Sequence, residues 1–129
     1  RRFAIANPAH APYGRAARAA LHHRGLWDAL APHLVLGENA AQATEFAASG
    51  ASDGGIVPLS LVQTAAVAKL GTSVPIPEAW HATVPLRQRM VLMARAGPTA
   101  AAFHTYLQQA SARDILARYG FTRPVETAP

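Results

Sequence analysis

The sequence predicts an α/β fold, with a parallel-type sheet flanked by helices. Between positions 3 and 70, short apolar runs alternate three times with stretches of helix-forming residues, and glycine or proline separates most of these segments. This alternation is typical of parallel strands joined by right-handed crossovers. Half of the 129 residues are hydrophobic, but many of these are alanine, so we expect a thin core.

The first strand is expected at 3–6, followed by a loop that is broken by prolines. A helix is predicted over 13–24, with Gly25 as its end. One further helical turn is expected at 26–30. A helix that starts at the carboxyl end of a strand leaves backbone N–H groups unpaired, so the junction at Tyr13 is a candidate anion site. Every α/β protein has such junctions, and water occupies most of them.

The second strand is expected at 34–36, and Asn39 is well placed to cap a helix over 40–49. The start of this helix, at Ala40 and Ala41, is a second candidate for anion binding. In parallel sheets, ligands bind beyond the carboxyl ends of the strands, where both junctions are expected to lie.

A third strand is expected at 55–57, and Pro58 ends it. A third helix is predicted over 59–70. Asp53 is interpreted as a turn residue before this strand rather than as an acid or base.

The sequence after position 72 is rich in proline at first and then apolar. Residues 87–94 have helical or strand potential, and the run 90–93 favours a strand with two buried faces. Pro98 is expected to begin a helix that ends near position 109, and Ser111 to cap a last helix that ends near 119. Residues 122–129 are expected to form a frayed tail.

Residue types argue against most catalytic and metal chemistry. The chain has no cysteine, which excludes disulfides and thiolate sites. Its six histidines show no metal-ligand spacing, so we interpret them as surface residues and expect no metal and no cofactor. Ser60 lacks the flanking glycines of a nucleophile elbow, and no glycine-rich phosphate loop occurs. We expect a binding protein rather than an enzyme.

The formal charge is +5, a balance that permits binding of nucleic acid or small anions. The basic residues are spread along the chain, so we interpret them as solvated helix faces and expect no nucleic-acid partner. No run reaches the roughly 18 apolar residues that a membrane helix needs. The chain opens without an apolar signal core, so we expect a targeting peptide to have been removed, or the chain to be a fragment.

Several blocks together resemble the second lobe of the periplasmic molybdate-binding proteins of ABC importers. They follow that family's order and spacing along nearly the whole chain. The blocks are AIANPAHAPYGRAA at 4–17, GLWDAL at 25–30, GENAAQ at 37–42, SGASDGGIV at 49–57 and RYGF at 118–121.

The resemblance implies one lobe of a periplasmic-binding-protein fold, whose family joins two α/β lobes by a hinge. Such proteins bind molybdate or tungstate between the lobes by hydrogen bonds alone. The resemblance implies that Tyr13 and Ala40 each supply a donor to the oxyanion. Some members carry a tyrosine just after the third strand, where this chain has Pro58, which has neither a hydroxyl nor an N–H group.

The resemblance also implies a domain organisation. Residues 1–85 correspond to the second lobe, 86–121 to a hinge strand with two C-terminal helices, and 122–129 to a tail. The first lobe, which also contributes ligands, is absent, so we expect about half of the site and weak or no molybdate binding. We expect the two helices to fold back on the lobe or to pair with another copy of the chain.

The implied setting is the periplasm, with an ABC permease as the partner of the full-length protein. Two alternatives remain open. The same fold serves as an effector-binding module in transcription regulators, although no helix-turn-helix is evident here. A non-binding interaction domain is the other.

Overall fold

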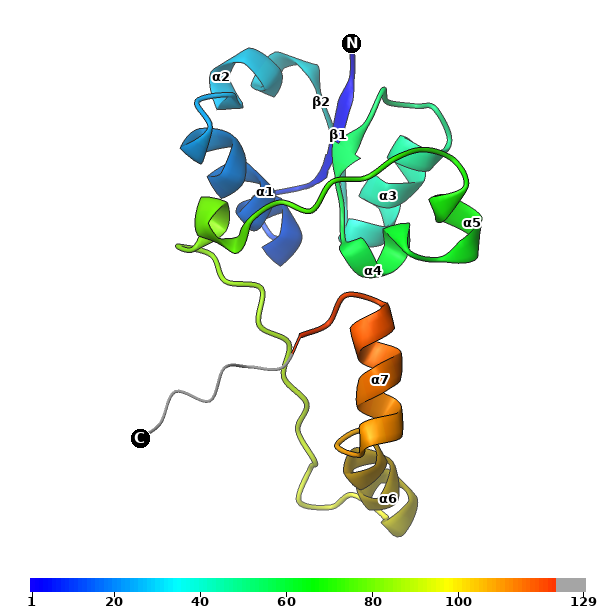
Figure 1. The fold of residues 1–129 in the computed structure, drawn as a ribbon. Helices are drawn as coiled ribbons and strands as arrows, with labels where there is room; N and C mark the ends of the chain where they lie inside the picture. The colour runs from blue at the N-terminus through cyan, green and yellow to red at the C-terminus, as the bar shows by residue number, and fades with distance from the viewer. Residues whose placement is uncertain (123–129) are drawn as a thin grey trace. The chain divides into compact units, whose positions relative to one another are not determined.

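The computed structural model describes residues 1–122. It divides into two compact units, Arg1–Leu86 and Arg87–Pro129, and each is described by itself (Figure 1).

The first unit is built on a parallel sheet of three strands in the order β2-β1-β3. Ile5 in the central strand pairs with Leu36 on one side and Ile56 on the other. The predicted α/β fold with a parallel sheet is therefore confirmed. The strands are β1 (Phe3–Ala6), β2 (Leu34–Gly37) and β3 (Gly55–Ile56).

The two long helices of this unit, α1 (Pro12–His23) and α3 (Ala40–Ala48), cover opposite faces of the sheet (Figure 1). The chain moves one way across the sheet from β1 to β2 and the other way from β2 to β3. Because parallel crossovers are right-handed, this reversal places the two connecting helices on opposite faces. The loops after β1 and β2 therefore lead to opposite faces of the sheet. Open α/β sheets bind ligands in the crevice between two such loops.

Short helical segments complete the first unit, and two helices belong to the second. The short segments are α2 (Trp27–Leu30), η1 (Ala31–His33), α4 (Leu59–Val62), α5 (Ala65–Ala68) and η2 (Glu78–His81). The second unit contains α6 (Pro98–Tyr106) and α7 (Ala110–Arg118).

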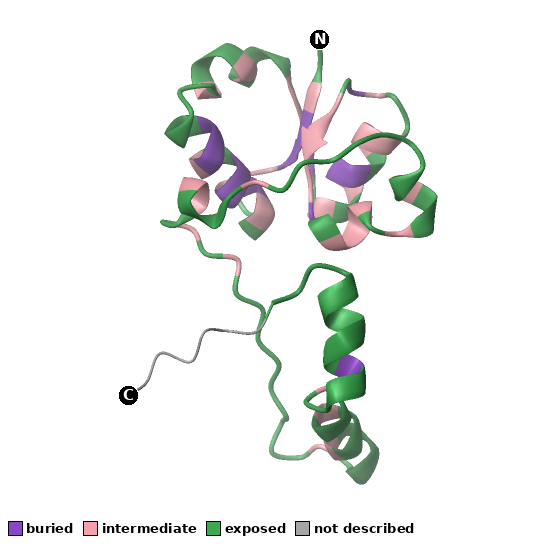
Figure 2. Cartoon of the chain, viewed as in Figure 1, coloured by how far each residue is buried: buried purple, intermediate pink, exposed green. Residues whose placement is uncertain are grey.

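The core of the first unit lies between β1 and the two long helices and consists mainly of alanine, as expected (Figure 2). Among the described residues, Ile5 is the only large side chain that is fully buried. Small residues allow the helix backbones to lie close to the sheet, and they bury little apolar area per residue.

The long helices begin and end where local sequence signals place them. The Asn39 side chain accepts a hydrogen bond from the Gln42 N–H at 2.9 Å, so the predicted cap of α3 is confirmed. Gly25 and Gly50, with φ of 65° and 80°, follow the ends of α1 and α3. These left-handed conformations favour glycine.

The single helix predicted over 59–70 is wrong, because the structure forms two short helices, α4 and α5. The break lies at Thr64, whose backbone is extended with ψ of 144°. Its hydroxyl donates to the Leu61 carbonyl at 2.8 Å. A threonine side chain that bonds nearby backbone competes with helix continuation, which explains the interruption.

The strand predicted over 90–93 is also wrong. These residues form no regular structure, and Val91 and Met93 are 78% and 72% exposed. A strand needs a partner for its backbone hydrogen bonds, and residues 87–122 contain no other strand to provide one.

In the second unit, Pro98 begins α6 as predicted, but Ser111 does not cap α7. The helix begins at Ala110 after an extended Gln109, which places Ser111 inside the first turn. Of residues 87–122, only Ala112 is buried. Most of the expected tail, 123–129, lies outside the described residues. No helix in the described part is both long and apolar enough to span a bilayer.

Candidate anion-binding site at the strand ends

The loops that leave the three parallel strands meet at one edge of the sheet. The Asn7 N–H donates to the Gly37 carbonyl at 2.7 Å, which continues the pairing of β1 and β2 into the loops. Tyr13 and Val57 both pack against a buried cluster formed by Ala6, Ala11 and Ala43. Residues that follow β1, β2 and β3 therefore share one small core.

Asn7 determines the shape of the loop between β1 and α1. Its carbonyl accepts the N–H of Ala11 at 2.9 Å, and its side-chain oxygen accepts the N–H of Ala9 at 3.0 Å. The second contact is the local turn that asparagine side chains commonly form. The loop thus closes on itself before Pro12 begins the helix.

The first turn of α1 lies directly on the end of β1. A Cβ atom added to Gly14 would lie 2.1 Å from the Ala6 carbonyl oxygen, so only glycine fits this approach. Proline occupies the first helical position, and the N–H of Arg15 is already bonded to the Ala11 carbonyl at 3.0 Å. Within residues 1–122, the N–H groups of Tyr13 and Gly14 have no hydrogen-bond acceptor.

The start of α3 has a similar arrangement. Asn39 accepts the N–H of Gln42 through its side chain and that of Ala43 through its carbonyl. The Gln42 side chain reaches back to accept the Glu38 N–H at 2.7 Å. The N–H groups of Ala40 and Ala41 are left without an acceptor in the part of the chain that the structure describes.

A histidine connects the two loops. The His10 Nε2 atom lies 2.9 Å from the Glu38 carbonyl oxygen and 3.4 Å from a carboxylate oxygen of the same residue. His10 is exposed, as expected for the histidines, but the sequence did not predict its link between the loops. No local sequence signal indicates it, because the partners are separated by 28 positions.

The end of β3 offers a different surface. Pro58 is buried, caps the four-residue helix α4 and has no N–H group to donate. Pro58 itself therefore offers no donor at this strand end, and Val57 contributes packing.

The chemistry of this edge suits an anion that is held by uncharged backbone donors. Four unpaired N–H groups belong to the positive ends of two helices that start from neighbouring strands. Such donors suit the oxygens of a small anion, and they require no cationic side chain. No group of three or more histidine, aspartate or glutamate side chains among residues 1–122 is placed to hold a metal ion.

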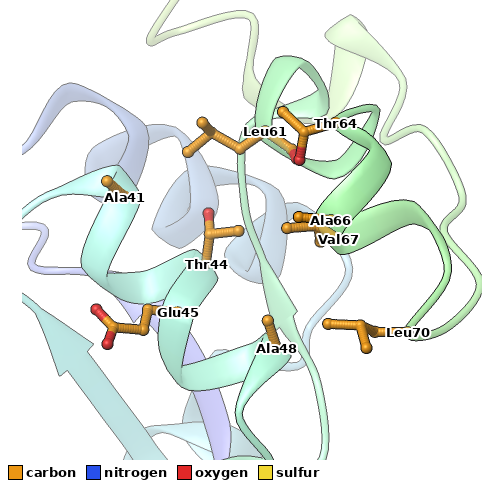
Figure 3. Close-up of a pocket in the computed structure, with 9 residues that line it drawn as sticks. All are labelled: Ala41, Thr44, Glu45, Ala48, Leu61, Thr64, Ala66, Val67 and Leu70. Carbon is orange, nitrogen blue, oxygen red and sulfur yellow. The ribbon is translucent and has the colours of Figure 1, made fainter.

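A hollow of about 360 Å³ lies elsewhere, between α3 and the pair α4 and α5 (Figure 3). Its walls are mostly aliphatic, including Leu61, Val67 and Leu70. The hydroxyls of Thr44 and Thr64 within it already donate to backbone carbonyls. These two hydroxyls are therefore not free to bind an anion.

Residues 1–122 match the family described as bacterial extracellular solute-binding protein. The match covers nearly all of the chain. The chain belongs to this family.

Curated relatives of this chain carry the name molybdate-binding protein ModA. Those of Rhodobacter capsulatus and Azotobacter vinelandii are 36% and 35% identical to it over 121 residues, which cover 92% of this chain. That of Escherichia coli is 34% identical over 123 residues, or 94% of the chain. The aligned regions make up 46%, 47% and 46% of these relatives. The chain thus spans about half the length of the curated relatives it matches.

A solved structure shows the same correspondence. The periplasmic molybdate-binding protein of Azotobacter vinelandii superposes with a TM-score of 0.81 and 32% identity. The superposition covers 96% of this chain and 55% of the solved chain. The chain therefore has part of a periplasmic-binding-protein fold.

Proposed function

We propose that this lobe binds a molybdate or tungstate oxyanion for uptake by an ABC transporter, with donors at Tyr13 and Ala40. The observation that carries the proposal is the pair of unpaired helix starts at neighbouring strand ends. The family of the chain and the names of its relatives support the choice of ligand. A solute-binding role involves capture and release, with no chemical step.

The site suits a tetrahedral dianion on physical grounds. Each oxygen accepts N–H hydrogen bonds, and the positive ends of α1 and α3 stabilise the charge without a salt bridge. Molybdate and tungstate are nearly equal in size, so these donors alone give no reason to distinguish them. Rejection of smaller sulfate would depend on the size of a closed cavity.

This chain is proposed to supply about half of the ligand contacts. It spans about half of its relatives, and the resemblance implies further donors from a first lobe. We therefore expect weak affinity from these residues alone. The proposed setting is the periplasm, with an ABC permease as partner. Pairing of two copies through α6 and α7 is a further expectation.

Replacement of Ala40 by proline tests the donor role directly. Proline removes the N–H, yet it is well tolerated at the first position of a helix. The preceding Asn39 is extended, with φ of −146° and ψ of 176°, which suits a residue before proline. Ala110→Pro makes the same change at the first position of α7 and serves as the control.

Binding is best followed by the amide resonances in a ¹⁵N–¹H NMR titration, which detects millimolar affinity. Molybdate should shift the Tyr13 and Ala40 signals in a saturable manner, whereas sulfate should shift them less. Ala40→Pro should reduce the Tyr13 shift, and Ala110→Pro should leave it unchanged. Shifts confined to other residues, or none at all, would contradict the proposed site. Submicromolar binding would contradict the expected half-site.

A further inference from the structure

A second feature of the first unit lies on the outer face of α1, beside the segment 79–84. There the two elements form a groove of about 500 Å³, which we call the basic groove. Side chains that carry or can carry positive charge line one wall, and the other includes an aromatic ring and a hydroxyl. These residues are Arg15, Arg18, His22 and His23 on α1, with Trp80 and Thr83 opposite.

Stacked rings hold the walls of the basic groove. The Arg24 guanidinium lies 4.8 Å from the centroid of the Trp80 ring, and His23 stacks on the same ring at 6.2 Å. His22 stacks on Trp27 at 5.1 Å. Contacts of this kind fix the position of η2 against α1, and they cover part of the Trp80 ring.

The groove carries unneutralised positive charge. No carboxylate lines it. Within residues 1–122, no hydrogen bond or ion pair engages the Arg18 side chain, and Arg15 uses one nitrogen to donate to the His10 carbonyl at 3.2 Å. Arg15, Arg18 and His22 follow an i, i+3, i+7 spacing, so they share one helix face over about 10 Å.

We propose that the basic groove is a docking surface for an acidic segment of a partner protein. The groove is open along the helix, and a row of carboxylates at helical spacing would match its row of basic side chains in length and complement the charge of its arginines. A second copy of the chain is a poor match, because its seven acidic residues are scattered and never closer than seven positions. Nucleic acid is disfavoured because Arg24 and His23 already stack on Trp80, the ring on which a base would lie.

The test uses a fluorescein-labelled helical peptide with glutamates at i, i+4 and i+7, and fluorescence anisotropy at low salt. A peptide with glutamine in place of each glutamate is the ligand control. Arg18→Glu reverses a charge in the groove, and Arg89→Glu makes the same change in net charge in the second unit. Thr83→Glu places a carboxylate on the opposite wall.

We expect saturable binding of the glutamate peptide that Arg18→Glu and Thr83→Glu each weaken about tenfold. Arg89→Glu should change the affinity less than twofold, and added salt should weaken binding. Circular dichroism should show that each variant is folded. The proposal is overturned if Arg18→Glu and Arg89→Glu weaken binding equally, if the glutamine peptide binds as well, if a short DNA duplex binds more tightly, or if no saturable binding occurs.

Discussion

The close contact of α1 with the end of β1 can be tested by adding one methyl group at Gly14. In Gly14→Ala, the new Cβ would lie 2.1 Å from the Ala6 carbonyl oxygen and 2.7 Å from the carbonyl carbons of Ala6 and Asn7. All three atoms are backbone, so no side chain can rotate to make room. Ordinary contacts are about 3.5 Å or longer, so the helix start must move by more than about 1 Å.

This displacement should lower the free energy of unfolding by about 1–3 kcal/mol, the usual cost of overpacking a closely packed site. With a urea m-value near 1 kcal/mol/M, the unfolding midpoint should fall by about 1–3 M. Circular dichroism during urea titration measures it. The same shift would move the Tyr13 N–H, so any molybdate-dependent change at Tyr13 should weaken in parallel.

Gly71→Ala provides the matched control. A Cβ at Gly71 meets no atom within 4 Å, and its φ is not positive. Its stability should therefore stay unchanged or rise by about 0.4–1 kcal/mol, because alanine restricts the unfolded chain. The reasoning fails if Gly14→Ala unfolds within about 0.5 kcal/mol of the parent, or if Gly71→Ala is equally destabilised.

Two further predictions concern α3 and the second unit. Asn39→Ala removes the acceptor of the Gln42 N–H and should lower the free energy of unfolding in urea by about 1 kcal/mol. Ser49→Ala, at the other end of α3, should lower it by less than about 0.5 kcal/mol. Equal effects of the two substitutions would contradict the capping role. Self-association is predicted from two exposed apolar residues, Phe103 on α6 and Ile115 on α7. Light scattering should therefore show a mass that rises with protein concentration. The double substitution Phe103→Ser and Ile115→Ser should reduce this rise. A constant monomer mass for the parent would refute that expectation.

The parts of the fold that the sequence predicts well depend on local signals. The helix over 40–49 has an asparagine cap at one end and a glycine at the other, and both act within a few residues. The strands at 3–6 and 34–36 are apolar and bounded by turns. By contrast, the break at Thr64 depends on a hydroxyl that bonds its own chain, and a threonine within an apolar run does not reveal that choice.

Apolar character alone also led to the wrong prediction of a strand over 90–93. Four large hydrophobic residues in a row are typical of a buried strand, but strand formation depends on a neighbouring edge. Residues 87–122 offer none. Hydrophobicity therefore indicated that this segment could be buried, without indicating by what.

The candidate site shows the same division between local and distant information. Asn39 and the prolines near Tyr13 indicate where helices start, and thus where N–H groups lack partners. The bonds that bring those starts together, from Asn7 to Gly37 and from His10 to Glu38, span about thirty positions and follow only from the strand order.

The small residues of the core and the geometry of the site are linked. Gly14 lies against Ala6, and a Cβ on Gly37 would lie 2.6 Å from the Ala43 nitrogen. These close approaches position the first turns of α1 and α3 at the strand ends, and larger residues would hold both turns away from the sheet. The alanine-rich core therefore buries little apolar area, but it allows two helix starts to reach the same edge. Substitutions that fill this core should thus affect the candidate donors as well as stability.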